Sequence, residues 1–435
     1  MDALEQEIIA AVDSRRESLL TYSRTIAAHA EAGFFEEKTA RLTAQMLQAE
    51  GLSPQTGLAR TGVKAVLQGG SPGPCAAVIG ELDGIRCPAH PQAVPGTGMS
   101  HACGHNAQLA AMVGAAMALS IPEVASALCG SVAFFAVPAE EYVPIPTRKA
   151  LQQEGIQFCC GKSELLRTGE FNGIDLALTT HVHMIPCESD LLLGNVASSG
   201  YISKTVTFRG RASHAAAAPW DGANALNAAS LALSAIGLMR ETFHDNDCVR
   251  IHTNIIQGGT ALNVVPETVV LEAMVRARTL DAMEDAAAKF DRACTYTAQA
   301  LGCVAEISTQ QGYLPVRYTP ACRAEMLAAQ ALSDKVSYTC AEPGFYNNAS
   351  TDVGDLTHVM PVVNFTHGGA QGALHSADFS LTDEEKAVLV PAKMMALTVY
   401  HLLRDGAALA KEVMAEFSPV YSVAEYIRHV EKGVQ

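Results

Sequence analysis

The chain has 435 residues, of which 49% are hydrophobic, so it is long enough to bury a substantial core in two or three domains. A formal net charge of −15, with Lys and Arg scattered along the chain, excludes the basic surface that nucleic-acid binding requires. We find no membrane-length apolar run, and the acidic residues 1–7 begin an amphipathic helix rather than a signal peptide, which predicts a cytoplasmic protein without a membrane partner. The twelve cysteines include no C-x-x-C pair, so most are expected to be reduced core residues.

Short apolar runs that predict strands alternate with longer helical patterns along most of the chain. In chain order, the patterns predict helices 5–28 and 38–50, strands 65–67 and 76–79, helix 107–119, strand 132–137, helix 148–152 and strand 176–180. After residue 199 they predict an edge strand 201–210, helix 222–238, strands 249–257 and 269–278, and helix 280–300, followed by strand 362–365 and a terminal helix 384–403.

This order predicts the fold class and the domain organisation. Alternating strands and helices favour an α/β domain with a mostly parallel sheet sandwiched by helices, formed by residues 1–198 and 310–435. Between them, 199–309 follows a β-α-β-β-α pattern, which is typical of a two-layer α+β domain inserted into the first.

Polar side chains follow the predicted strands of the larger domain at the points where the strands end. Glu81 and Asp83 follow 76–79, Glu140 and Glu141 follow 132–137, His181 and His183 follow 176–180, and His375 lies beyond 362–365. Ligands bind at the carboxyl ends of strands in open α/β sheets, so we expect these groups to converge on a shared metal site.

The segment His101-Ala102-Cys103-Gly104-His105-Asn106 has two imidazoles and a thiol at every second position. In extended backbone alternate side chains share a face, which predicts that Cys103 and His105 reach one metal ion together. A thiolate and an imidazole suit Zn²⁺ or a similar divalent ion.

The adjacent pair Glu140-Glu141 leaves a strand, where neighbouring side chains point in different directions. One carboxylate is then free to bind metal while the other faces the substrate. Metal-dependent hydrolysis needs this division, because a base that is not a tight ligand must take a proton from water and pass it to the leaving amine.

Together these motifs resemble the amidohydrolase branch of the co-catalytic zinc aminoacylases and carboxypeptidases, which includes aminobenzoyl-glutamate, hippurate and auxin-conjugate hydrolases. Three motifs look most like the large subunit of aminobenzoyl-glutamate hydrolase and its relatives: Gly-Glu-Leu-Asp, Cys-Gly-His-Asn and Ala-Ser-Thr-Asp-Val-Gly-Asp. The matching motifs are Gly80-Glu81-Leu82-Asp83, His101-Ala102-Cys103-Gly104-His105-Asn106, Pro138-Ala139-Glu140-Glu141, Ser213-His214-Ala215-Ala216, Asn263-Val264-Val265-Pro266, Ala349-Ser350-Thr351-Asp352-Val353-Gly354-Asp355 and Leu374-His375-Ser376.

The resemblance implies two divalent ions per chain, Zn²⁺ or Mn²⁺, with a general base, a supporting carboxylate and a shared thiolate. The implied metal ligands are Cys103, His105, Glu141, His181 and His375. Glu140 is the implied general base, and Asp83 is expected to support a ligand rather than to coordinate. Two features depart from the pattern: Asn106 stands where many relatives have Asp, and His183 is a rival ligand.

The resemblance also implies that the inserted domain is a lid that pairs subunits into a homodimer or higher homo-oligomer. It places His214 at the scissile carbonyl, with Asn263 and Arg276 binding the carboxylate of a small-molecule substrate. Alternatively, Arg276 forms an ordinary salt bridge and Arg278 binds the substrate carboxylate. Segment 142–160 either lines the substrate pocket or lies at an edge of the domain without contacting the substrate.

We therefore predict a metal-dependent hydrolase that cleaves the amide bond of an N-acyl or N-aminoacyl amino acid. One alternative is a dipeptidase that acts on a free N-terminal amine. Another is a catalytically silent scaffold with the same fold, although none of the expected ligands is missing from the sequence.

Overall fold

The computed structural model describes residues 1–158 and 160–432, which form two compact units. The first unit comprises Met1–Ala197, Arg317–Asn347 and Asp355–Ala424. The second comprises Ser198–Val316, Asn348–Gly354 and the end of the chain from Glu425. The segment 199–309, predicted as an inserted domain, thus falls within the second unit, which continues to Val316.

The first unit is built on an eight-stranded sheet with the order β1-β2-β6-β3-β7-β16-β8-β14. Its central strands β6, β3, β7 and β16 are parallel, as are β8 and β14, whereas β1, β2 and the β16–β8 pair run antiparallel. The sheet is therefore mixed and mostly parallel, as predicted. Its strands are β1 (Gln55–Leu58), β2 (Gly62–Gln68), β3 (Ser71–Glu81), β6 (Cys129–Val137), β7 (Leu176–Val182), β8 (Leu191–Leu193), β14 (Tyr338–Cys340) and β16 (Val362–His367).

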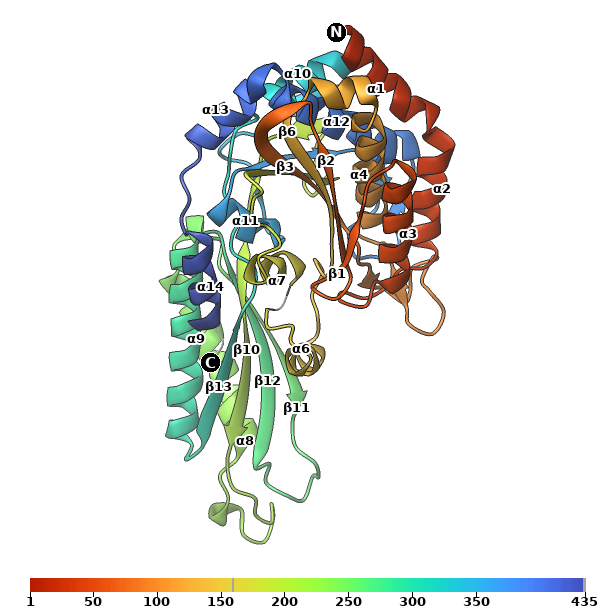
Figure 1. Ribbon diagram of the computed structural model, residues 1–435. Helices are drawn as coiled ribbons and strands as arrows, with labels where there is room; N and C mark the ends of the chain where they lie inside the picture. Colours follow the sequence, from red (N-terminus) through yellow and green to blue (C-terminus); the bar gives the residue numbers. More distant parts are fainter. Residues whose placement is uncertain (159, 433–435) are drawn as a thin grey trace. The chain divides into compact units, whose positions relative to one another are not determined.

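Helices flank this sheet (Figure 1). The helices before residue 200 are α1 (Ala3–Ser14), α2 (Arg16–Ala27), α3 (Glu37–Ala49), α4 (His105–Leu119), α5 (Pro122–Ala127), α6 (Ile145–Gln153) and α7 (Gly161–Arg167). Those after residue 320 are α10 (Arg323–Leu332), α11 (Val353–Val359), α12 (Val390–Leu403) and α13 (Ala408–Glu416), whereas most of α14 (Val423–Lys432) belongs to the second unit. Two short ribbons, β4 (Ile85–Arg86) with β5 (Met99–Ser100) and β17 (Ala370–Gln371) with β18 (Ser380–Leu381), shape the loops near the strand ends.

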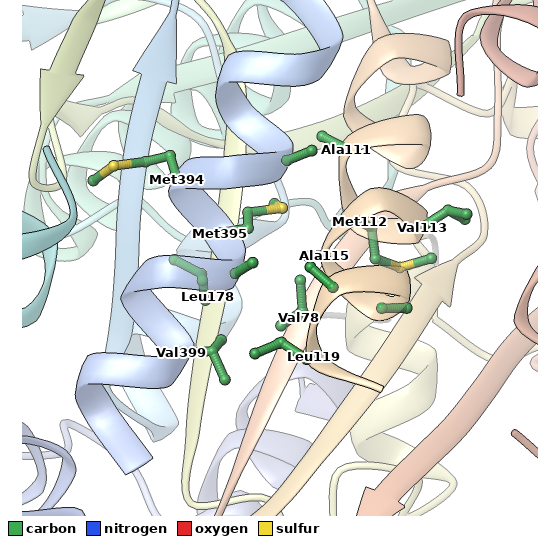
Figure 2. Close-up of a cluster of buried hydrophobic side chains, with 14 of the residues drawn as sticks. Val78, Ala111, Met112, Val113, Ala115, Leu119, Leu178, Met394, Met395 and Val399 are labelled. Carbon is green, nitrogen blue, oxygen red and sulfur yellow. The ribbon is translucent and has the colours of Figure 1, made fainter. Parts of the chain in front are cut away.

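The core of the first unit centres on α4, whose 15 residues are all buried. A helix without a polar face must be enclosed, and α4 packs against α1, α2, α12 and strand β3. Figure 2 shows Val78 and Leu178 of the sheet beside Leu119 of α4 and Val399 of α12. Burying side chains of this size stabilises the fold by roughly 1.5–3 kcal/mol each.

One helix of the described chain, Glu385–Leu403, is long and apolar enough to cross a membrane by length and composition. The sequence analysis predicted this helix as 384–403 but did not note that it is long and apolar enough to cross a membrane. Since 94% of its most apolar window is buried within the protein, it has the properties of a core helix. Length and hydropathy alone do not distinguish a membrane-spanning helix from a helix buried in a protein core.

The second unit contains a four-stranded antiparallel sheet with the order β11-β12-β10-β13, and α8 and α9 pack on it (Figure 1). The elements are β10 (Gly200–Arg209), α8 (Ala225–Leu238), β11 (Arg250–Gln257), β12 (Thr268–Ala277), α9 (Leu280–Ala300) and β13 (Val304–Gln311). Alternate residues of β12 are buried, as expected for a sheet covered by helices on one face.

Several predictions of single elements were wrong. Strand β10 was predicted at an edge but lies inside the sheet, between β12 and β13. The error arose because the polar strand β13, which covers that edge, was not predicted. Helix 5–28 is two helices that meet at Arg15, and helix 384–403 is not terminal, since α13 and α14 follow it. Periodicity identifies single elements, whereas breaks and neighbours depend on tertiary contacts.

Candidate metal centre

Five segments bring polar side chains to the carboxyl ends of the parallel strands. Strand β3 ends at Glu81, and β7 carries His181 one residue before its end. Strand β6 ends at Val137, before Glu140 and Glu141, and His375 lies in the loop between β17 and β18. The fifth segment is the turn before α4, and this turn carries Cys103.

That turn differs from the extended backbone expected from the sequence. Gly104 has φ +89° and precedes α4, whose first residue is His105. This left-handed conformation favours glycine, and a Cβ atom at residue 104 would lie 3.1 Å from Cγ1 of Val182. Cys103 and His105 therefore converge through a tight turn and a helix start, not through strand alternation.

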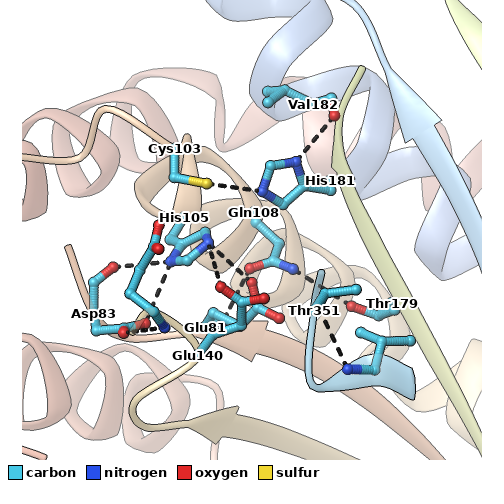
Figure 3. A network of polar contacts seen from close by, with 12 residues as sticks. Glu81, Asp83, Cys103, His105, Gln108, Glu140, Thr179, His181, Val182 and Thr351 are labelled. Atoms are coloured by element: carbon cyan, nitrogen blue, oxygen red, sulfur yellow. Dashed lines mark hydrogen bonds and ion pairs between the residues drawn. The ribbon is translucent and has the colours of Figure 1, made fainter. Parts of the chain in front are cut away.

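The thiol of Cys103 lies between two imidazoles. Its Sγ is 3.4 Å from Nε2 of His181 and 3.3 Å from Nε2 of His375 (Figure 3 shows the former). Nε2 of His375 is in turn 3.1 Å from Oε1 of Glu141.

Two candidate ligand groups among the described residues share this thiol. Cys103, His105 and His181 form one group, and Cys103, Glu141 and His375 form the other; within each, one ligand atom per residue lies within 4.8 Å of the others. A thiolate common to two groups is able to bridge two ions. The five ligands expected from the sequence are thus brought together.

Asp83 orients two of these residues. Nδ1 of His105 lies 2.9 Å from the backbone carbonyl oxygen of Asp83 and 3.3 Å from its Oδ1. When Nδ1–H donates to Asp83, the lone pair of Nε2 faces the centre. The backbone N–H of Glu141 also donates to Oδ2 of Asp83 over 2.8 Å.

The electrostatics of the centre suit cations. Burial opposes a charge on His105, yet Cys103 and Glu81 raise the pKa of its imidazole well above the usual range. Burial and the nearby Glu141 raise the pKa of the Cys103 thiol. The carboxylates of the centre lie close together and away from water. Bound cations would offset the repulsion between these negative charges and would stabilise the thiolate form of Cys103.

Unpartnered atoms point to the same ligand class. Within the described residues, Glu81 Oε2, His105 Nε2 and Glu141 Oε1 are buried without a hydrogen-bond partner. Buried polar atoms normally have partners, so three such atoms in one cluster require a group that accepts several lone pairs. The thiol, imidazole and carboxylate donors therefore fit divalent metal ions.

Several known proteins are similar to this chain. Residues 196–300 match the peptidase dimerisation domain of the M20 family. The chain is 27% identical to the Xaa-Arg dipeptidase of Mus musculus over 73% of this chain and 70% of that protein. It is 24% identical to one of the subunits of the Escherichia coli p-aminobenzoyl-glutamate hydrolase over 98% of this chain and 97% of that one. The crystal structure of a dinuclear metal-binding M20 peptidase from Bacillus subtilis superposes with a TM-score of 0.65 at 22% identity, covering 90% of this chain and 99% of that chain.

These matches make the chain similar to M20 peptidases, with the dimerisation domain matched over residues 196–300. The match to the dimerisation domain, the fold and the two groups of donors agree with the resemblance stated from the motifs.

The rival ligand, His183, faces other partners. Its Nδ1 lies 2.8 Å from Oγ1 of Thr366, and its Nε2 lies 3.0 Å from the carbonyl oxygen of Ser189. With both ring nitrogens engaged in hydrogen bonds, it joins neither group of candidate ligands. The geometry favours His181 over His183 as the ligand.

The sequence analysis placed Glu81 among the converging groups without giving it a role, and it did not select Lys162. A third group of candidate ligands, Glu81, His105 and Glu140, lies beside the other two. Glu81 was visible in the motif before Asp83, but only Asp83 was assigned a role. Lys162, at the start of α7, belongs to no motif, and only the folded chain shows that it contacts Glu81.

The residues predicted to act on or bind the substrate lie in the second unit. Nδ1 of His214 accepts hydrogen bonds from the backbone of Ala216 and Ala217 at 3.2 and 3.0 Å, which leaves Nε2 to carry the proton and donate. The carbonyl oxygen of Asn263 accepts from the N–H of Ala215, so Asn263 lies beside His214. Arg276 lies on β12, and its buried Nε has no hydrogen-bond partner among the described residues.

The segment 142–160 contains α6 and includes residue 159, which lies outside the described residues. Arg148 is buried and donates from Nε to the carbonyl oxygen of Val143 over 2.6 Å. Its guanidinium also lies over the ring of Tyr142. Whether this segment lines a substrate pocket stays a prediction.

Proposed function

We propose that this M20 protein is a metal-dependent amidohydrolase that cleaves the amide bond of an N-acyl or N-aminoacyl amino acid. The observation that carries the proposal is the pair of ligand groups that share Cys103, with Glu140 beside them. Similarity to the Escherichia coli p-aminobenzoyl-glutamate hydrolase supports the substrate class. We expect the enzyme to act in the cytoplasm.

In this proposal, each residue of the centre has one role. Cys103, His105, Glu141, His181 and His375 would hold two divalent ions, with Zn²⁺ or Mn²⁺ as the expected metals. When bound, such ions lower the pKa of water and polarise the amide carbonyl. Glu140 takes the proton of the water and passes it to the leaving nitrogen, and Asp83 keeps His105 and Glu141 oriented.

His214, Asn263 and Arg276 are proposed to bind the substrate. The proton on Nε2 makes His214 a donor suited to the oxyanion that develops at the scissile carbonyl. The guanidinium of Arg276 is a permanent cation that matches a carboxylate, and its buried Nε lacks a partner within the described chain.

The substrate carboxylate provides the test of this function. Amidating or esterifying it should lower kcat/KM by an amount equivalent to about 2–4 kcal/mol, because the guanidinium of Arg276 loses its charged partner. Arg276→Ala should remove the preference for the acid, and Arg278→Ala is the matched control that should retain it. The measurement is kcat/KM for paired acids and amides in a screen of N-acyl and N-aminoacyl amino acids. Equal cleavage of acids and neutral amides by the unmodified enzyme would contradict the carboxylate clamp.

A dipeptidase is the second candidate function, because the mouse Xaa-Arg dipeptidase is similar to most of the chain. The same screen distinguishes the two functions. A dipeptidase should lose activity when the N-terminal amine of its substrate is acetylated, whereas an N-acyl amino acid hydrolase should not. A scaffold without activity would cleave neither class.

The M20 dimerisation domain supports a homo-oligomer in which His214 acts in the partner's active site. Two inactive variants, His214→Ala and Glu140→Gln, should then regain part of the activity when mixed, because hybrid dimers contain one intact site. Activity after subunit exchange and the oligomeric mass by light scattering are the measurements. A fully active monomer would exclude this arrangement.

A further inference from the structure

A buried ion pair lies directly against the proposed metal centre. Nζ of Lys162 is 2.6 Å from Oε1 of Glu81, and the two side chains are 0% and 2% exposed. Removing both charges from water is costly, and a pair at this position contributes little net stability by itself. The function of the ion pair is therefore inferred from the groups that the carboxylate of Glu81 contacts.

The second carboxylate oxygen of Glu81 faces His105. Oε2 lies 3.2 Å from Nε2 of His105, but without hydrogen-bond geometry, and neither atom has a hydrogen-bond partner among the described residues. Figure 3 shows Glu81, Glu140 and His105 directed toward one another. Oε2 of Glu140 is farther from the same nitrogen, at 3.7 Å.

This spacing is that of two ligands on one ion. Nitrogen and oxygen ligands at 2.0–2.2 Å from a tetrahedral Zn²⁺ lie roughly 3.3–3.5 Å apart. Two atoms at this separation that do not hydrogen-bond to each other are placed as two ligands of one metal ion would be. Since Nδ1 of His105 is engaged by Asp83, Nε2 is the nitrogen that faces this point.

Glu81 is held at two places. Lys162 binds Oε1, which restricts rotation of the carboxylate and leaves Oε2 toward His105. The backbone N–H of Glu81 donates to Oε1 of Gln108 over 2.9 Å, and Nε2 of Gln108 donates to the carbonyl oxygen of Thr180 over 2.6 Å. The position of Oε2 is thereby tied to strands β3 and β7.

We propose that Glu81 is a further ligand of the ion bound by His105, and that Lys162 is a positioning residue that aims its carboxylate and balances its charge. This inference rests on the proposed metal-dependent function. It assigns an oxygen donor beyond the five ligands named above. Glu140, the more distant of the two carboxylates, then stays available as the base.

Glu81→Gln is the test variant, since it keeps the size of the side chain and an oxygen for Lys162. Metal-free protein is titrated with Co²⁺ and Zn²⁺ against a chelator. We expect the affinity for one ion to fall at least tenfold, because a neutral amide is a weak ligand. The visible spectrum of the Co²⁺ protein should also change, since the ligand set of one ion changes.

Glu164→Gln is the matched control. Glu164 is also buried and paired with a cation, Arg167, but it accepts from the backbone of Gln157 and Phe158 and belongs to no group of candidate ligands. This variant should keep the metal affinities and the Co²⁺ spectrum of the unmodified protein. Thermal unfolding of the metal-free variants checks that both have folded.

The outcomes separate the inference from the proposed function. If unmodified protein binds no stoichiometric metal, the proposed function fails. If it binds two ions and Glu81→Gln binds both with unchanged affinity and spectrum, only the role of Glu81 is wrong. A crystal structure of the metal-loaded, unmodified protein decides the matter should Glu81→Gln not fold. An Oε2–metal distance near 2.0–2.2 Å supports the inference, and one beyond about 3 Å overturns it.

Discussion

Replacing Glu140 with Gln should lower kcat by about a hundredfold or more while both metal ions stay bound. The amide cannot take the proton from water, yet it keeps the size of the side chain. Oε2 of Glu140 is 3.7 Å from Nε2 of His105, close enough to serve the centre but farther than Glu81. Steady-state kinetics and metal content measured on the same preparation provide the test.

The adjacent carboxylate supplies the comparison. Oε1 of Glu141 lies 3.1 Å from Nε2 of His375 and belongs to a ligand group with Cys103. Burial would raise the pKa of Glu141, but the contact with His375 lowers it, which keeps the carboxylate ionised as a ligand must be. Glu141→Gln should therefore weaken metal binding. Metal loss in Glu140→Gln with intact metal in Glu141→Gln would exchange the two roles.

Substituting Cys103 should affect both ions, because its thiol is shared by the two groups. Unmodified protein should carry up to two Zn²⁺, Mn²⁺ or similar ions per chain, and chelation should abolish activity that added metal restores. Cys103→Ser should reduce metal content and activity together, because a hydroxyl is a poorer ligand than a thiolate. Elemental analysis and activity assays measure both effects.

Cys294 offers a matched control. It is a buried cysteine on α9 in the second unit and belongs to none of the candidate ligand groups. Cys294→Ser should keep the metal content and activity of the unmodified protein. If Cys103→Ser retained full activity and metal-replete protein contained no stoichiometric metal, the centre would be assigned wrongly.

The short sequence separation within these motifs explains why the proximity of several candidate ligands was predictable. Cys103 and His105 are two residues apart, and Glu140 and Glu141 are neighbours, so local chain geometry alone limits where these pairs lie. The end of a buried strand is also visible as an apolar run that stops. Parallel strands that carry such groups at their ends bring them to one edge of the sheet, and His181 lies there in one group of candidate ligands with Cys103 and His105.

Details within those segments depended on tertiary contacts. The turn at Gly104, with φ +89° against Val182, replaced the extended backbone expected from residue spacing. The choice between His181 and His183 followed from the neighbours of each ring, since Thr366 and Ser189 engage His183. Spacing in the sequence treats the two histidines alike, because both leave the same strand on the same face.

By itself, the sequence indicated most element types, the mostly parallel sheet and the candidate metal ligands, because these depend on periodicity and on local motifs. Only the tertiary structure decided that β10 is an inner strand beside β13 and that Lys162 lies against Glu81. Lys162 is 81 residues from Glu81, and no periodic pattern links the two. Their pairing exists because packing excludes water from both charges, and burial of that kind is a property of the assembled core.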